Sequence, residues 1–371
     1  MTLKDIIKPP AALGFRPDHL DLARALLEQG LHDQLYSTAV YCIMRHGMIA
    51  AHGAMGDAQP DASPPIPARF DTIFDMASVT KSMTGAMVMQ CVEEGKLRLS
   101  HTVGRLLPEA EGKPLGKVTV RQIASHTSGL PAWLPLYKSP ELVFDQILAA
   151  GLKTEPGTQY VYSDLGYITL GKILERVTGS PLDQLVQARI CEPLGMKDSG
   201  YRPDPSRKPR IAATAHHIDG QTRAYIGDVH DENALGMNGV AGHAGFFSTA
   251  PDLVRFALSY QFPTVAAHLG IPPVLGMLSR KVAQTIQCDP KVGSHGVGWF
   301  IWPSGYLPTG ELLSDRCYGH NGFTGTLLMF VPVNDIAIIL LTNRVVSKSD
   351  GSAFLALRHP FANIIGGALI T

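Results

Sequence analysis

The period of the apolar residues changes along the chain, and this change constrains the fold more than any other feature. The first 55 residues predict one helix at 18–29 and then a strand over 37–49 that turns at His46-Gly47, with 50–55 as its hairpin partner. The last 80 residues return to short strand patterns at 296–301, 326–331 and 336–341, and they close with an apolar helix at 352–369.

Between these ends, from residue 78 to about 289, helical patterns alternate with loops rich in proline and glycine. We therefore predict an α+β fold, in which the two chain ends form one antiparallel β-sheet flanked by helices and the middle is an inserted, mostly helical domain. The predicted domains are 1–75 with 290–371, and 76–289, with an active site in the cleft between them.

The composition narrows the classes of molecule that the protein is expected to bind. Of 371 residues, 45% are hydrophobic, so the chain can bury a large core. Lysine plus arginine and aspartate plus glutamate both number 32, and this balance gives no electrostatic reason to expect nucleic acid or an anionic membrane surface as a partner. A small neutral molecule fits better, and the sequence does not indicate an oligomeric state.

The five cysteines are scattered, with no C-x-x-C spacing, and we expect reduced core residues. No run of about 18 apolar residues predicts a membrane span. The amino terminus carries no signal-peptide pattern, so we expect a cytoplasmic protein, or a periplasmic one if a leader has been removed.

The tetrapeptide Ser78-Val79-Thr80-Lys81 begins a predicted amphipathic helix that runs from about residue 78 to 94. Positions i and i+3 share one face of a helix, so Lys81 can lie beside the Ser78 hydroxyl. The positive end of the helix favours an anion at Ser78, and the pair is able to form a nucleophile. Taken alone, the same residues could be a helix cap and a solvated lysine.

A second polar group, Tyr162-Ser163-Asp164, precedes a predicted helix that ends at Gly179. Near a lysine cation, Tyr162 could hold a lowered pKa and relay a proton from the serine. The alternative is a simple helix cap at Ser163 or Asp164 with Tyr162 in the core.

A third group, running from His320 through Asn321 and Gly322 to Phe323, lies on a predicted turn between strands. Glycine lets the backbone come close to a ligand, so an N–H here could form half of an oxyanion hole. A plain hairpin turn is the alternative.

Together these groups resemble the serine β-lactamase and penicillin-binding-protein superfamily, in its class C-like branch with family VIII carboxylesterases and D-amino-acid peptidases. The resemblance covers most of the chain. It extends to three further segments in the family's order, which are 123–130 (IASHTSGL), 193–196 (PLGM) and 240–250 (VAGHAGFFSTA).

The resemblance implies a serine hydrolase of the β-lactamase/transpeptidase-like fold that works through an acyl-enzyme. Ser78 would attack an ester or amide carbonyl, with Lys81 and Tyr162 sharing the general-base work. The backbone N–H groups of Ser78 and Phe323 would form the oxyanion hole.

Two departures from the family pattern bear on the substrate. Asp164 stands where an asparagine is usual, and an ionised carboxylate cannot donate a hydrogen bond; it would instead hold Lys81. His320 stands where a lysine is usual, and histidine is mostly neutral near pH 7. Both changes weaken the recognition of a substrate carboxylate, so we expect a carboxylesterase on small neutral esters. A β-lactamase, a D-amino-acid peptidase or amidase, an acyltransferase and a non-catalytic sensor are the alternatives.

The other predicted substrate contacts are Asn321, Gly322 and two aromatic residues, Trp133 and Tyr137, which could form an apolar pocket wall or simply pack in their loop. The G-x-S-x-G pattern of another hydrolase class is absent. No H-E-x-x-H or similar ligand spacing occurs, and we read His230-Asp231-Glu232 as loop structure. We predict no metal and no cofactor.

Overall fold

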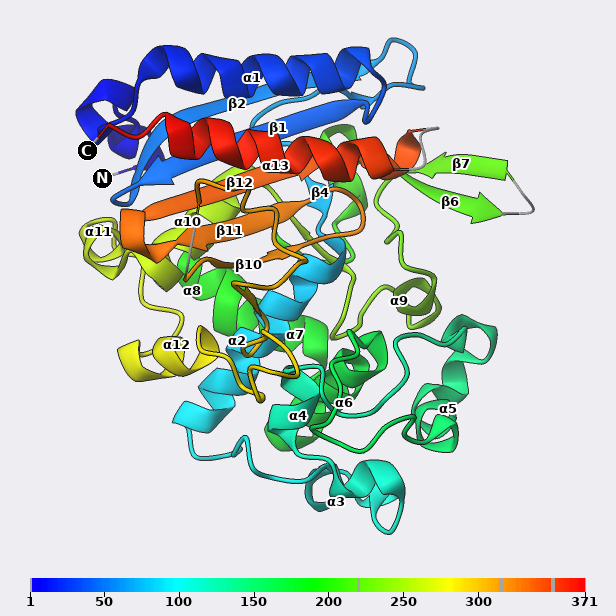
Figure 1. Cartoon of the computed structure of the whole chain (residues 1–371). Helices are drawn as coiled ribbons and strands as arrows, with labels where there is room; N and C mark the ends of the chain where they lie inside the picture. The colour runs from blue at the N-terminus through cyan, green and yellow to red at the C-terminus, as the bar shows by residue number, and fades with distance from the viewer. Residues whose placement is uncertain (1, 219–220, 314–315, 348–350, 371) are drawn as a thin grey trace.

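The two ends of the chain form one antiparallel sheet. The computed structural model describes residues 2–218, 221–313, 316–347 and 351–370. Its seven-stranded sheet has the order β3-β2-β1-β12-β11-β10-β9 (Figure 1). The strands are β1 (Thr38–Arg45), β2 (Met48–Gln59), β3 (Ile66–Pro67), β9 (Phe300–Ile301), β10 (Tyr318–Asn321), β11 (Leu327–Val331) and β12 (Ile336–Thr342). The α+β prediction is confirmed.

The pairing of β1 with β12 joins the two ends, with Cys42 opposite Ile339. Every residue of both strands is buried, because helices cover both faces of the sheet. On one face lie α1 (Pro17–His32) and α13 (Ser352–Gly367), as Figure 1 shows. The core on the other face includes α10 (Ala250–Gln261) and α2 (Thr80–Glu93). The helices predicted at 18–29 and 352–369 and the first hairpin are therefore confirmed, with modest changes of length.

The middle of the chain is mostly helical but also contains short strands. Two small sheets lie here, one of β4 (Phe74–Asp75), β8 (Phe246–Ser248) and β5 (Gly200–Tyr201), the other a projecting hairpin of β6 (Thr214–Ile218) and β7 (Gln221–Tyr225). The remaining helices are α3 (Val103–Leu106), α4 (Val120–Ala124), α5 (Val143–Ala150), α6 (Asp164–Thr178), α7 (Leu182–Val186), α8 (Glu192–Leu194), α9 (Glu232–Gly236), α11 (Pro263–His268) and α12 (Met277–Ala283). The domain boundaries themselves stay a prediction.

The helix predicted at 78–94 forms, but its amphipathic character was wrong. A short 3-10 turn, η3 (Ala77–Val79), carries the serine, and α2 follows it. Positions 80–89 and 91 are all buried, because α2 runs through the molecule between the sheet and the other helices of the middle region. The polar residues that suggested a solvated face make internal hydrogen bonds instead; for example, the Thr84 hydroxyl donates to the Gly242 carbonyl at 2.7 Å.

The strand predicted at 296–301 is mostly absent, since only Phe300 and Ile301 pair with β10. Gly298 has a positive φ of 81°, which breaks the strand, and its backbone crosses α2. A Cβ at Gly298 would lie 2.8 Å from the Lys81 carbonyl oxygen. This crossing holds the lysine-bearing turn of α2 against the sheet side of the molecule.

The five cysteines are free, and all are buried except Cys288, which is half-buried. The prediction of reduced core residues is confirmed for four of them. Among the described residues, no helix is both long and apolar enough to cross a membrane.

The close packing of residues 297 and 298 on α2 allows a prediction about the stability of the fold. Replacing a helical glycine by alanine normally stabilises a helix by about 1 kcal/mol. At Gly85 the new Cβ would lie 2.7 to 2.9 Å from backbone atoms of Val297 and Gly298, so we expect Gly85→Ala to destabilise the fold. A loss of about 1 to 3 kcal/mol in the unfolding free energy, measured by urea denaturation, is typical of such overpacking.

Gly305→Ala is the matched control, because no atom lies within 4 Å of the position of its Cβ. Its stability should stay within about 0.5 kcal/mol of the wild type. If Gly85→Ala were as stable as this control or more so, the close packing of residues 297 and 298 on α2 would be wrong.

Candidate active site

The predicted nucleophile lies on a turn that is held by a buried carboxylate. Ala77, the residue before Ser78, has a positive φ of 44°, which is unfavourable for a residue with a side chain. One oxygen of Asp75 accepts the Ala77 N–H at 2.8 Å, and the other accepts the His230 N–H at 2.7 Å. Burial raises the pKa of Asp75 to about 6, and the nearby Asp231 carboxylate adds to the rise, while the two N–H bonds oppose it.

The strand that carries the third motif is pinned to this same turn. The Thr324 hydroxyl donates to the Asp75 carbonyl at 2.8 Å, and the Thr326 hydroxyl donates to the Met76 carbonyl at 3.0 Å. Gly322 passes so close that a Cβ would lie 2.5 Å from the Met76 carbonyl oxygen. The predicted oxyanion donors, the N–H groups of Ser78 and Phe323, belong to these two joined segments.

Lys81 is fully buried and lies among three oxygen atoms. Its Nζ donates to the Ser78 Oγ at 2.9 Å and to the His243 carbonyl at 3.1 Å. It also forms an ion pair with Asp164, at 2.8 Å from the nearer carboxylate oxygen. The expectation that Asp164 would hold Lys81 rather than face a substrate amide agrees with this contact.

Tyr162 completes the group. The Ser78 hydroxyl is near enough to influence the pKa of the Tyr162 phenol, and the centre of the Tyr162 ring is 4.8 Å from Lys81 Nζ. The predicted direction of its pKa, however, was wrong. Burial and the Asp164 carboxylate raise the pKa of Tyr162 well above its usual value, more than the nearby Ser78 hydroxyl lowers it. The resting side chain is therefore a neutral phenol, which suits a proton donor.

A buried histidine positions the second motif. The Ser163 N–H donates to Nδ1 of His126 at 2.9 Å, so this imidazole carries its hydrogen on Nε2. Burial, with the nearby His295, Lys81 and His320, lowers the pKa of His126 well below its usual value and keeps Nδ1 free to accept. Ser163 in turn caps α6 by accepting the Gly166 N–H.

The third motif brings no cation. His320 is fully buried, and burial, with Lys81 and His295, lowers its pKa well below the usual value. Its Nδ1 lies 2.9 Å from the Asn321 carbonyl, so Nδ1 carries the hydrogen. Asn321 donates from its amide to the Tyr306 carbonyl at 2.5 Å.

Three aromatic side chains of predicted site residues are exposed: that of Phe323, a predicted oxyanion-hole residue, and those of Trp133 and Tyr137, the predicted pocket wall. Phe323 is 61% exposed, Trp133 44% and Tyr137 39%. The rings of Trp133 and Tyr137 lie 6.4 Å apart, and the Ala132 carbonyl accepts the Asp164 N–H, which places this loop beside the second motif. Their role as a pocket wall stays a prediction.

Sequence reasoning missed several residues that contact this group. The ring of Tyr306 stacks on that of Tyr162, with 5.8 Å between the ring centres. The centre of the His126 ring lies 4.5 Å from that of Tyr162. Tyr306 follows a loop with no periodic pattern or motif, so no signal in the sequence identifies it as a site residue. His126 lies within a segment recognised only as family-like.

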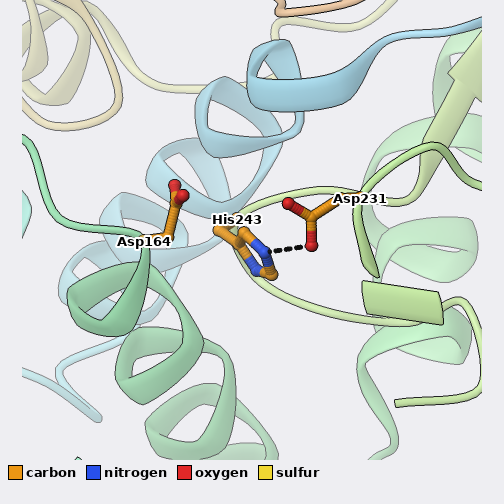
Figure 2. Close-up of side chains that lie close together, drawn as sticks. All are labelled: Asp164, Asp231 and His243. Carbon is orange, nitrogen blue, oxygen red and sulfur yellow. Dashed lines mark hydrogen bonds and ion pairs between the residues drawn. The ribbon is translucent and has the colours of Figure 1, made fainter. Parts of the chain in front are cut away.

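Asp231 and His243 were not predicted to contact the site, although both lie beside it. A carboxylate oxygen of Asp164, one of Asp231 and a ring nitrogen of His243 lie within 4.8 Å of one another (Figure 2). Such a set could hold a metal ion, but the Lys81 ammonium is already paired with Asp164. A metal ion here would have to compete with Lys81 for the Asp164 carboxylate.

Comparison with known proteins agrees with this geometry. The family model for beta-lactamase matches residues 23–359. The chain belongs to the β-lactamase family. Within this family, a protein of Salmonella agona strain SL483 named "Putative D-alanyl-D-alanine carboxypeptidase" is 34% identical over 313 residues, covering 76% of this chain and 71% of the relative.

Two solved structures show the same fold. EstCE1, described as a hydrolase with promiscuous acyltransferase activity, has a TM-score of 0.75 and 20% identity, over 94% of this chain and 98% of its own. The octameric penicillin-binding protein homologue from Pyrococcus abyssi has a TM-score of 0.72 and 22% identity. The match covers 94% of this chain and 77% of the homologue. The chain is thus a serine hydrolase of the β-lactamase fold, as expected from the motifs.

The Asp75 carboxylate gives a prediction that depends on pH. An ionised Asp75 can accept both N–H bonds, whereas the protonated acid loses one acceptor, so activity should fall as the pH drops through about 6. Asp75→Asn removes one acceptor at every pH. We expect it to lower kcat by up to about 100-fold, since a displaced nucleophile is costly, and to lose the acid step near pH 6.

The stability of the fold should change with pH in the direction opposite to that of the activity. The folded pKa lies above the unfolded value of 3.8, so the native state holds a proton that the unfolded chain has lost between about pH 4 and 6. Relative to Asp75→Asn, the wild type should lose about 3 kcal/mol of stability as the pH rises through this window. A difference that does not vary with pH, measured by urea denaturation at pH 4 and pH 7, would contradict this account.

Proposed function

We propose that this protein is a carboxylesterase that hydrolyses small neutral esters through an acyl-enzyme on Ser78. The observation that carries the proposal is the absence of a free cation at the two motif positions that deviate from the family. Asp164 pairs with Lys81, and His320 is buried with a lowered pKa. A substrate carboxylate would find a carboxylate and a neutral imidazole in these places.

The proposed reaction uses the three residues in sequence. In the amine form, Lys81 takes the proton of the Ser78 hydroxyl as the serine oxygen bonds to the ester carbonyl carbon. The N–H groups of Ser78 and Phe323 stabilise the oxyanion. As the bond from the carbonyl carbon to the alkoxy oxygen breaks, the neutral Tyr162 phenol gives its proton to the leaving alcohol.

Lys81 then returns a proton to Tyr162, which restores both groups to their starting state. Water attacks the acyl-enzyme in the second half of the reaction, and the same pair accepts its proton and gives one to Ser78. The acid and the alcohol leave separately, and no cofactor takes part in any of these steps.

A D-amino-acid peptidase is the second candidate, favoured by the name of the curated relative from Salmonella. Its substrate would carry a terminal carboxylate, which the two departures from the family pattern disfavour. Release of D-alanine from a D-alanyl-D-alanine peptide, faster than ester hydrolysis, would make this second candidate the better one.

The nucleophile is tested with a chromogenic ester. Wild-type protein should hydrolyse p-nitrophenyl butyrate, and Ser78→Ala should abolish turnover, since it removes the attacking oxygen. Mass spectrometry after a brief exposure to an ester should show an acyl group on residue 78 of the wild type only. An unchanged rate in the variant, or an acyl group on another residue, would refute the proposal.

Substrate preference is tested with a β-lactam. The catalytic efficiency for p-nitrophenyl butyrate should exceed that for the anionic nitrocefin, because neither Asp164 nor His320 can attract a carboxylate. Kinetics at pH 7 on both substrates give the ratio. A preference for nitrocefin would mean that another cation serves the carboxylate.

A further inference from the structure

Asp231 and His243 lie next to the proposed catalytic group, and their hydrogen bonds go to Ala234, to each other and to Lys81 rather than to Ser78. We propose that they form a positioning pair for Lys81, in which His243 holds the carbonyl that the lysine contacts and Asp231 supplies a second negative charge beside the ammonium. The proposal rests on the proposed function in one respect, that Lys81 acts on Ser78.

The first step is the chemistry of the atoms around Lys81 Nζ. A carbonyl and a carboxylate can accept N–H groups but have no proton to give, whereas the Ser78 hydroxyl can give one. The His243 carbonyl, at 3.1 Å, and Asp164, at 2.8 Å, therefore hold the amine, and Ser78 is its proton source among these contacts. If the His243 carbonyl moved, Lys81 would lose one of its two fixed acceptors.

The second step is what fixes that carbonyl. The His243 side chain is 1% exposed, and its Nε2 donates to Asp231 at 2.8 Å (Figure 2). The preceding residue, Gly242, accepts the Thr84 hydroxyl of α2 and could not carry a Cβ, which would lie 2.1 Å from the Tyr167 carbonyl oxygen. The segment is thus clamped to the lysine-bearing helix on one side and to Asp231 on the other.

The third step is the charge of Asp231. Burial opposes its ionisation, but His243, the Ala234 N–H and Lys81 together hold the pKa of Asp231 below its usual range. The same oxygen that accepts from His243 also accepts the Ala234 N–H at 2.8 Å and caps α9. Asp231 is therefore a rigid anion at the N-cap of a short helix.

Asp231 and Asp164 come from different parts of the chain, and each offers an oxygen within 4.8 Å of the other (Figure 2). Asp164 pairs directly with Lys81, and Asp231 acts on the lysine through its charge from beside Asp164. The other titratable groups around Lys81 and Asp231 are Asp75, His126, Tyr162, Tyr167, His295 and His320. The three imidazoles have lowered pKa values and the two phenols raised ones, so these five groups are driven toward their neutral forms.

The test compares Asp231→Asn with the wild type in ester hydrolysis across pH. We expect kcat to fall about 10- to 100-fold with KM nearly unchanged, because Lys81 loses its orientation. A fall in thermal stability alone, with kcat unchanged, would make Asp231 a helix cap only.

Asp252→Asn is the matched control. Asp252 is 6% exposed, and it accepts the Asp198 N–H and the Ser199 hydroxyl far along the chain from the three motifs. Its loss should lower stability but leave kcat in place. If both variants lowered kcat equally, the effect would be general destabilisation, and the proposal would be wrong.

His243 gives a second pair of variants. In His243→Gln the side-chain amide can still donate to Asp231, whereas in His243→Ala it cannot. We expect the glutamine variant to keep at least about a third of the wild-type kcat and the alanine variant to behave like Asp231→Asn. Equal losses in both variants would contradict a role for the hydrogen bond.

A double-mutant cycle keeps the proposal testable without catalysis. The urea midpoint of Asp231→Asn should fall less in a Lys81→Met background than in the wild type, because the charge interaction has already gone. If the shifts of the urea midpoint were simply additive, the proposed interaction between Asp231 and Lys81 would be refuted. This would hold even if Ser78→Ala abolished turnover. Turnover that survives Ser78→Ala would instead refute the proposed function, whatever the cycle gave.

Discussion

The close approach of the β10–β11 turn to the nucleophile turn is the contact on which the rest of the site depends. Two hydroxyl groups, from Thr324 and Thr326, bind successive carbonyls of the segment that leads to Ser78. These bonds need Gly322, since any side chain there would strike the Met76 carbonyl. Because β10 is also paired in the main sheet, the serine turn is fixed relative to the whole sheet, although it begins the helical middle of the chain.

Electrostatics in the site follow from burial. Lys81 is paired with the Asp164 carboxylate, while the nearby histidines and tyrosines are pushed toward their neutral forms. Within the three motifs, charge is therefore confined to Lys81 and Asp164. A neutral carbonyl substrate can enter such a site without a new unpaired charge, whereas an anionic one would need a cation that the motif residues do not offer.

The helices and strands that could be predicted are those with an uninterrupted period. α1, β1 with β2, β11, β12 and α13 all follow a long apolar pattern, and each forms near its expected bounds. The failures occurred where tertiary contacts decide the outcome. Residues 296–299 look like a strand but cross α2 through a glycine with positive φ, and α2 looks amphipathic but is enclosed by the inserted region.

The sequence by itself indicated the reaction class, because the i to i+3 spacing can place Lys81 beside Ser78 and the other motifs give that pair its context. The order of the motifs and segments also indicated the family. Only the tertiary structure decided the protonation state of Tyr162 and the location of Asp231 and His243 near Lys81. A pKa depends on burial and on charges that are remote in the chain, and neither quantity is contained in local spacing.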